Sequence, residues 1–205
     1  MTDHALPLRL VSGAAAPVAA PEPTALVESY RRLADVFHDV LAEQSLDALL
    51  DRIANALADL VPHDSLTIYE ADEPLRMLSA VWARDKWADK ILADSCPFGV
   101  GLTGWGVEHR ESVRVNQAHL DPRTSTVPGT PEDEPEALIT IPLIARDSIK
   151  GALNIYRLGD DASFDDDEFE LAKRFGDAAA LALDNAQIRQ RLEHQAQTDP
   201  LTGLF

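Results

Sequence analysis

The order of helical and extended patterns along the chain is the feature that most limits its fold. Apolar residues recur at helical spacing between Leu46 and Leu60, and again from about Asp166 toward Gln197. Between these helices lie short apolar or alternating stretches bounded by turn residues, which are typical of strands. The predicted strands are residues 66–69, 75–82, 113–115, 137–144 and 150–157. The pattern therefore predicts strand pairs enclosed by a helix at each end, with a long proline-rich loop over residues 116–136.

Capping residues indicate where the two long helices begin. Ser45 stands directly before the first apolar repeat, where its hydroxyl group can accept a backbone hydrogen bond. Asp165 and Glu168 have the spacing of a capping box, and Phe164 and Phe169 have the spacing of a hydrophobic staple. These patterns predict N-caps at Ser45 and Asp165.

Charge and cysteine content exclude several classes of protein. The formal net charge of -17 argues against nucleic acid or an anionic membrane surface as a partner, because both require clustered Lys and Arg. A single cysteine, Cys96, rules out an internal disulfide and indicates a reducing compartment. No apolar stretch reaches the length of a membrane span, and Asp3 and the early prolines do not suit a signal peptide. We therefore expect a soluble cytoplasmic protein.

Two narrow apolar seams predict association with a second copy of the chain. Residues 1–23 form an Ala- and Pro-rich lead that we expect to be disordered. Residues 24–44 then form a predicted dimerisation helix, with heptad spacing of Leu26, Tyr30, Leu33 and Phe37. Residues 181–197 repeat this spacing with Leu181, Asn185, Ile188 and Leu192. A polar Asn at a core position can specify register, so a parallel homodimer is expected, with packing on its own domain as the alternative.

Short motifs in the central part of the chain resemble those of GAF domains. They are F-G-V-G-L-T-G-W-G-V at 98–107, V-R-V-N at 113–116, H-L-D-P-R at 119–123, I-T-I-P-L-I at 139–144, K-G-A-L-N-I-Y at 150–156, S-F-D-D-D-E-F-E-L at 163–171 and A-L-D-N-A at 182–186. The resemblance places a GAF domain at residues 45–180, followed by a signalling helix at 181–197. It implies an α+β fold, with a central antiparallel sheet, the terminal helices on one face, and short helices and loops over a ligand pocket on the other.

The pocket implied by this resemblance has several candidate residues. Aromatic walls suit a planar heterocycle, although large aromatic residues also fill cores. The ligand-binding candidates are Trp82, Trp87, Phe98, Thr103, Trp105, Asn116 and Asp121. GAF domains variously bind cyclic nucleotides, tetrapyrroles, haem or small metabolites, and many have no known ligand. The resemblance therefore leaves the ligand unidentified, and the sequence itself requires no cofactor and predicts no metal site.

The sequence is less consistent with a dinucleotide, bilin or haem site or with a sulfoxide reductase active site. The G-x-G-x-x-G spacing of Gly99, Gly101 and Gly104 lacks the strand–helix–strand context of a dinucleotide site. Cys96 is followed by Pro97, whereas bilin-binding GAF domains usually have His after their cysteine. GAF-type methionine sulfoxide reductases rely on several cysteines, and for haem only His119 is a candidate axial ligand. A redox enzyme of the sulfoxide reductase type and a ligand-free structural dimer remain as alternatives.

Residues 198–205 read T-D-P-L-T-G-L-F, which resembles the start of the GGDEF domain of diguanylate cyclases. An ordinary Pro-Gly turn at a helix end is the alternative. The resemblance implies a regulatory segment cut at the start of its output domain, which would use GTP and Mg²⁺ to make cyclic di-GMP. We do not expect residues 1–205 to catalyse this reaction alone, because they lack the Gly-Gly-(Asp/Glu)-Glu-Phe loop.

Overall fold

A computed structural model of the chain describes residues 45–198. Its helices are α2 (Leu46–Leu60), α3 (Ala88–Leu92), α4 (Gly101–His109), the 3-10 helix η1 (Ala118–Leu120) and α5 (Asp166–Thr198). Its strands are β1 (Ser65–Asp72), β2 (Met77–Arg84), β3 (Ser95–Pro97), β4 (Val113–Val115), β5 (Glu136–Ala145) and β6 (Ser148–Leu158). The predictions for residues 1–44, including the seam of Leu26, Tyr30, Leu33 and Phe37, lie outside the described residues.

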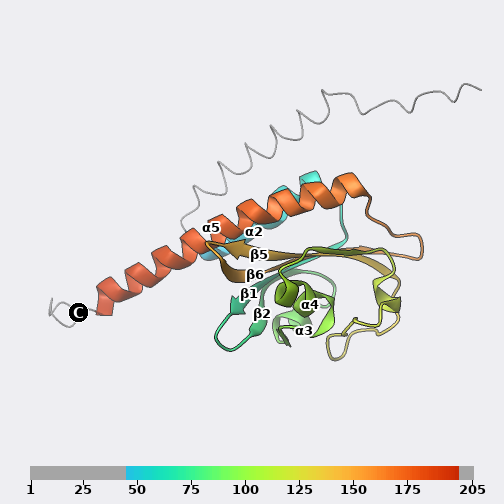
Figure 1. The fold of residues 1–205 in the computed structure, drawn as a ribbon, viewed down its shortest axis with the longest axis horizontal. Coiled ribbons are helices and arrows are strands. Elements are labelled where there is room, and N and C mark those ends of the chain that lie inside the picture. The colour runs from blue at the N-terminus through green and yellow to red at the C-terminus, as the bar shows by residue number, and fades with distance from the viewer. Residues whose placement is uncertain (1–44, 199–205) are drawn as a thin grey trace, which may run out of the picture.

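The strands form one six-stranded antiparallel sheet in the order β3-β2-β1-β6-β5-β4. Helices α2 and α5 cover one face, while α3, α4 and the loop over residues 121–135 cover the other (Figure 1). The predicted α+β fold with its antiparallel sheet is therefore confirmed. The sequence did not predict β3, because Ser95, Cys96 and Pro97 include none of the β-branched or aromatic residues that indicate a strand.

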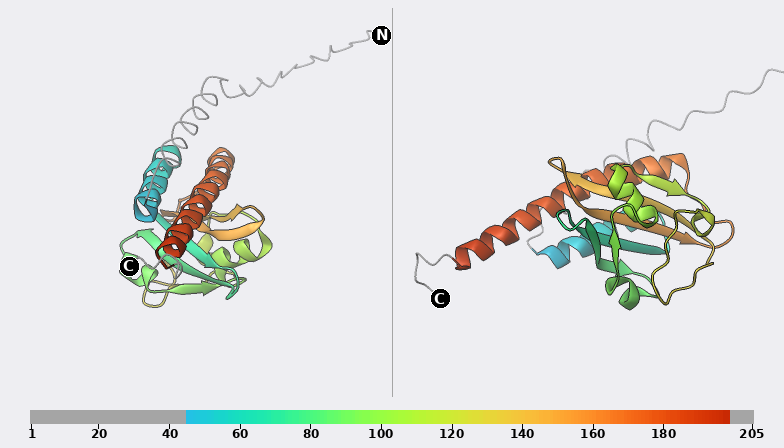
Figure 2. Two further views of the ribbon diagram at one scale, coloured as in Figure 1. Left: turned by 90° about the vertical axis from the view of Figure 1, so that its left-hand side faces the viewer. Right: turned by 60° about the horizontal axis from the view of Figure 1, so that its bottom comes forward.

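Helix α2 begins where the capping pattern predicts. Ser45 Oγ accepts a hydrogen bond from the Ala48 backbone N–H at 3.2 Å. The predicted apolar face of the helix is buried against the sheet and α5, and Figure 2 shows α2 and α5 together on this face. Its buried members are Leu49, Leu50, Ile53, Ala54 and Leu57.

Helix α5 begins with the predicted capping box. The Glu168 N–H donates to Asp165 Oδ1 at 2.8 Å, and the Asp165 N–H donates to Glu168 Oε2 at 3.0 Å. Phe164 is buried in the core, and Gly176 lets the helix approach β5 so closely that a Cβ there would lie 2.5 Å from Ile141 Cγ2. The helix then continues past the end of the sheet (Figure 1). None of the helices in residues 45–198 is long and apolar enough to span a membrane.

A buried acid holds the middle of α5 to the sheet. Asp184 is only 2% exposed, and its Oδ1 lies 2.7 Å from Lys150 Nζ of β6. Arg146 Nε, from the β5–β6 turn, lies 3.2 Å from Asp184 Oδ2 without the alignment of a hydrogen bond. One turn further on, Gln187 Nε2 donates to Glu70 Oε1 of β1 at 2.7 Å. These contacts tie α5 to two neighbouring strands.

Most of the predicted seam on α5 is exposed to solvent. Leu181 is 48% exposed and Leu192 is 60% exposed, whereas Ile188 is half-buried. Asn185 is exposed, and its Oδ1 accepts a hydrogen bond from Arg146 Nη2 at 3.4 Å. Large apolar side chains therefore stay on the surface at heptad positions, and the dimer itself stays a prediction.

Candidate functional site

Two adjoining chambers lie between the sheet and the loop that follows η1. Their volumes are about 110 and 250 Å³, and together they exceed the lower end of the range for ligand pockets, about 300 Å³. The residues that line both chambers are Thr124, Ser125, Thr126, Val127, Glu136 and Tyr156. Loop residues thus form one wall of both chambers, and Glu136 of β5 and Tyr156 of β6 stand where the two meet.

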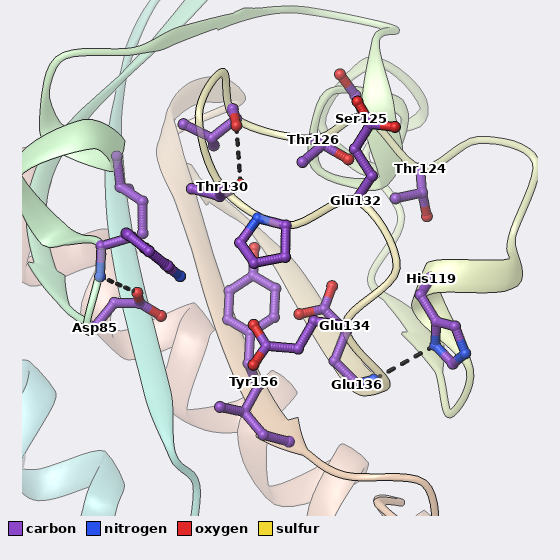
Figure 3. A pocket seen from close by; sticks show the side chains of 15 residues that line it. Asp85, His119, Thr124, Ser125, Thr126, Thr130, Glu132, Glu134, Glu136 and Tyr156 are labelled. Atoms are coloured by element: carbon purple, nitrogen blue, oxygen red, sulfur yellow. Dashed lines mark hydrogen bonds between the residues drawn. The ribbon is translucent and has the colours of Figure 1, made fainter.

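The smaller chamber is lined by acidic side chains from distant parts of the sequence. Asp85 directly follows β2, Glu132 and Glu134 come from the loop, and Glu136 comes from the start of β5. Figure 3 shows Glu134 and Glu136 beside Tyr156, with Asp85 facing them from the other side. Neither chamber has a lysine or arginine among its described lining residues. The lining of the smaller chamber is therefore acidic.

Glu136 is the most perturbed acid of this site. Burial raises its pKa to about 7, and the negative charges of Glu134 and Asp85 contribute to the rise. The Glu136 backbone N–H donates to Nδ1 of His119 at 3.4 Å, which connects η1 to the start of β5. The described residues donate no hydrogen bond to the Glu136 carboxyl group. This carboxyl group is thus an available acceptor that changes charge near neutral pH.

Trp87 lines the same chamber and carries an unpaired donor. Its Nε1 is buried and has no hydrogen-bond partner among the described residues. Its backbone N–H donates to Asp85 Oδ1 at 2.6 Å, and Lys90 Nζ lies 4.3 Å from the centre of its ring. Because a buried N–H without an acceptor is costly, the indole favours a ligand that carries an acceptor.

A buried polar network connects the chambers with the centre of the sheet. Asn154 is fully buried on β6, and its Nδ2 donates to Thr103 Oγ1 of α4 at 2.7 Å and to the Tyr156 hydroxyl at 2.9 Å. Thr140 Oγ1 of β5 donates to Asn154 Oδ1. Burial raises the pKa of Tyr156 well above its ordinary value, so its hydroxyl stays protonated. The network fixes one wall of the site.

Of the predicted ligand-binding residues, Trp87 and Thr103 reach the chambers. Trp82 was expected beside the pocket, but it lies on the opposite face of the sheet, where its Nε1 donates to Asp51 of α2 at 2.7 Å. Phe98 is buried in the cluster under α4 and lines neither chamber. Trp105 stacks on His109, with ring centres 4.2 Å apart, outside both chambers. The aromatic residues that line the chambers are therefore Trp87, Tyr69 and Tyr156, of which only Trp87 was expected there.

Asn116 and Asp121 lie in a separate open hollow beside η1. Asn116 has a structural role, because its Oδ1 accepts the Phe164 backbone N–H at 3.0 Å. Asp121 is paired with Arg123 at 2.8 Å, which lowers the pKa of this carboxyl group. The structure thus does not bring these two residues to the chambers.

Cys96 also lines the larger chamber. Burial raises the pKa of its thiol, and Sγ donates to the Val100 carbonyl oxygen at 3.1 Å. These surroundings favour the protonated thiol over the reactive thiolate. Within residues 45–198, no three His, Cys, Asp or Glu side chains gather as a group that could hold a metal ion.

Comparison with known families agrees with this geometry. The profile of the GAF domain family matches residues 43–184, which is more than half of the chain. The chain belongs to the GAF domain family. This GAF domain is accordingly a sensory or regulatory module, and the family resemblance of the central motifs is confirmed.

Solved structures with the same fold come from proteins of different kinds. The GAF domain of a phosphoenolpyruvate-protein phosphotransferase from Coxiella burnetii is 20% identical, with a TM-score of 0.69, covering 80% of this chain and 98% of that one. The free methionine-R-sulfoxide reductase from Neisseria meningitidis, solved with its substrate, is 18% identical, with a TM-score of 0.65 and coverages of 83% and 96%. The GAF-B domain of DevS from Mycobacterium smegmatis is 19% identical, with a TM-score of 0.54 and coverages of 68% and 93%. At this level of identity the likeness establishes the fold alone.

Proposed function

We propose that this GAF domain is a cytoplasmic, ligand-responsive regulatory module that controls a diguanylate cyclase through α5. The observation that carries the proposal is the continuity of α5. One helix of 33 residues packs on the sheet with its first part and ends at Thr198, where the T-D-P-L-T-G-L-F motif begins. A continuous helix that packs on the sheet can transmit a structural change in the sheet to the part of the chain that follows the helix.

The contacts between the sheet and α5 support this route. On β1, Tyr69 lines the larger chamber, and the next residue, Glu70, accepts the hydrogen bond from Gln187 of α5. On β6, Tyr156 faces the chambers, and Lys150 pairs with Asp184. Ligand binding that shifts either strand would therefore act directly on α5.

The exposed seam of α5 supports a parallel homodimer as the form that transmits the signal. Burying a leucine-sized side chain contributes about 1.5–3 kcal/mol, and a symmetric dimer buries each seam residue twice. Leu181 and Leu192 are both exposed and suit this role. In the proposal the sequence-predicted helix 24–44 adds a second helix to the interface, and no nucleic acid or membrane takes part.

Sedimentation of a seam variant tests the dimer. Leu192→Glu places two like charges in the seam, so we expect it to shift the protein toward monomer with its circular dichroism unchanged. Leu120→Glu is the matched control, because Leu120 is 67% exposed on η1, outside α5 and its seam. A wild-type protein that is monomeric at tens of micromolar, or equal effects of the two substitutions, would contradict the dimer.

A redox enzyme of the methionine sulfoxide reductase type is the second candidate. One observation favours it, namely that Cys96 lines the larger chamber. The raised pKa of the thiol works against it, because reactive cysteines have lowered values. Activity of the wild type on free methionine sulfoxide that is lost in Cys96→Ser would establish this second function.

A further inference from the structure

Tyr69 of β1 brings a hydroxyl group without a partner to the larger chamber. The residue lines this chamber and is only 9% exposed. Within residues 45–198 its hydroxyl group takes part in no hydrogen bond, and its oxygen still keeps some accessible surface. A nearly buried donor therefore opens on the chamber and has no acceptor among the described residues.

Asn154 makes two further hydroxyl groups available as donors. Its Nδ2 donates to Thr103 Oγ1 at 2.7 Å and to the Tyr156 hydroxyl at 2.9 Å, so both N–H groups of the amide are used. A hydroxyl group that accepts such a bond keeps its own proton for another partner. The described part of the chain accepts neither of these protons, and Thr103 and Tyr156 both line the larger chamber.

Neither Cys96 nor Glu136 takes up these donors, although both line the same chamber. The Cys96 thiol donates to the Val100 carbonyl oxygen at 3.1 Å, and the Glu136 carboxyl group accepts no hydrogen bond from the described residues. Burial raises the pKa of Tyr69 and of Tyr156 well above the ordinary value, so both phenols keep their protons. Because buried polar groups are normally paired, this set of donors points to a ligand that supplies an acceptor.

We propose that the larger chamber binds a small, uncharged ligand of the amide class, whose carbonyl oxygen accepts a hydrogen bond from Tyr69, with Thr103 and Tyr156 as further donors. The N–H group of an amide is matched by the Glu136 carboxyl group, which stands where the two chambers meet. The proposal deepens the proposed function and rests on it, since it takes this chamber to be the ligand site of the module.

Hydrogen bonding and charge together exclude the other ligand classes. An ammonium or amidinium ion carries donors only, and would leave all three hydroxyl groups without an acceptor. A carboxylate or phosphate group would accept from them, but the described lining of the larger chamber contains Asp94 and Glu136 and neither lysine nor arginine. Burying an anion without a counter-ion is costly. An uncharged carbonyl group satisfies the donors without this cost.

Three benzene derivatives of similar shape separate these classes. Benzamide is an uncharged amide, benzamidine is a cation without an acceptor, and benzoate is an anion. Their dissociation constants would be measured at about pH 8 from chemical-shift changes in proton–nitrogen NMR spectra of the protein. We expect benzamide to shift signals of the residues that line the larger chamber, and to bind about tenfold or more tightly than the other two.

Tyr69→Phe removes the hydroxyl group and keeps the ring. The affinity for benzamide should fall about fivefold, because one neutral hydrogen bond is lost. The urea midpoint should not fall, because the hydroxyl group has no partner among the described residues to lose. Ser148→Ala is the matched control, since it removes a hydroxyl group that lines neither chamber, and it should change the affinity by less than about twofold.

The remaining outcomes refute the inference in distinguishable ways. Equal affinities of wild type and Tyr69→Phe for benzamide refute the role of Tyr69, and a clearly lower urea midpoint of the variant shows that its hydroxyl group has a partner within the protein. Benzamidine or benzoate binding in the same chamber as tightly as benzamide refutes the ligand class but supports the ligand site of the proposed function. No shift with any of the three compounds at about 10 mM also refutes the inference. The dimer of the proposed function is tested separately, by sedimentation without ligand.

Discussion

The substitution Glu136→Gln should stabilise the protein at high pH and have little effect at low pH. Burial and the neighbouring acids raise the pKa of Glu136 in the folded state from 4.5 to about 7. The folded protein therefore holds a proton that the unfolded chain releases between these two values. Across this interval, stability falls as the pH rises, and above about pH 7 the full penalty of the charged carboxylate is present. Glutamine has the same shape without the charge.

The size of the effect follows from the shift in pKa. A difference of about 2.5 units corresponds to about 3.4 kcal/mol if the shift is fully expressed. Because the carboxyl group is only partly buried, solvent screening reduces this value, and we expect about 1–2 kcal/mol. The free energy of unfolding of Glu136→Gln should therefore exceed that of the wild type by this amount at about pH 8.5.

Urea denaturation of the wild type and the variant, followed by circular dichroism, measures this difference. The assay is repeated at about pH 5, where most of the difference should be gone, because Glu136 is then protonated in the folded state. Subtracting the stability difference at about pH 5 from the difference at about pH 8.5 removes any effect of the amide group that does not depend on pH. A difference that is independent of pH, or a variant less stable than the wild type at about pH 8.5, would refute the reasoning.

Two further substitutions test the packing around the site. Gly104→Ala should lower the free energy of unfolding by about 1–3 kcal/mol in urea denaturation, because its Cβ would lie 2.4 Å from the Pro97 carbonyl oxygen; an unchanged midpoint would show that α4 can shift freely. Asp184→Asn should lower the free energy of unfolding by about 3 kcal/mol, because Lys150 loses its partner beside α5, and should speed hydrogen exchange in β6. Exchange that is faster only in α5 would contradict the attachment of α5 to β6 through Asp184 and Lys150.

Local patterns were sufficient to predict where the two long helices, α2 and α5, begin. The hydrogen bonds of a cap connect residues three positions apart, so Ser45, Asp165 and Glu168 could be assigned without knowledge of the fold. The strand Val113–Val115 was predicted with its observed bounds, since flanking polar residues delimit it. The resemblance to GAF domains then implied the layers of the fold, with the terminal helices on one face of an antiparallel sheet.

The face on which Trp82 lies could not be predicted from alternation. Simple alternation would place Leu78, Ala80 and Trp82 on one face of β2. An irregularity in the β1–β2 register, between Ile68 and Tyr69, shifts the alternation after Ala80. Leu78 and Ala80 therefore pack under α4, whereas Trp82 packs toward α2. Bulges of this kind depend on pairing between strands and leave little trace in a single strand.

The sequence also gave no sign of the role of Glu136. It follows Glu132, Asp133 and Glu134 in a proline-rich loop, and such a run of acids is usually solvated. Its surroundings come from Asp85, 51 positions earlier, and from Tyr156 on the neighbouring strand. The raised pKa is therefore a property of the folded chain, which only long-range contacts create.

The central claim is that α5 transmits the state of the GAF domain. Changing the heptad register of this helix in an active cyclase tests that claim most directly. Cyclic di-GMP synthesis would be measured for residues 1–205 joined to a diguanylate cyclase catalytic domain, with insertions placed directly before Thr198. Seven added residues preserve the heptad seam, so we predict a rate within about twofold of the parent. Two added residues rotate the following chain by about 200°, so we predict a loss of about tenfold or more. Equal rates for the two insertions would contradict transmission through α5.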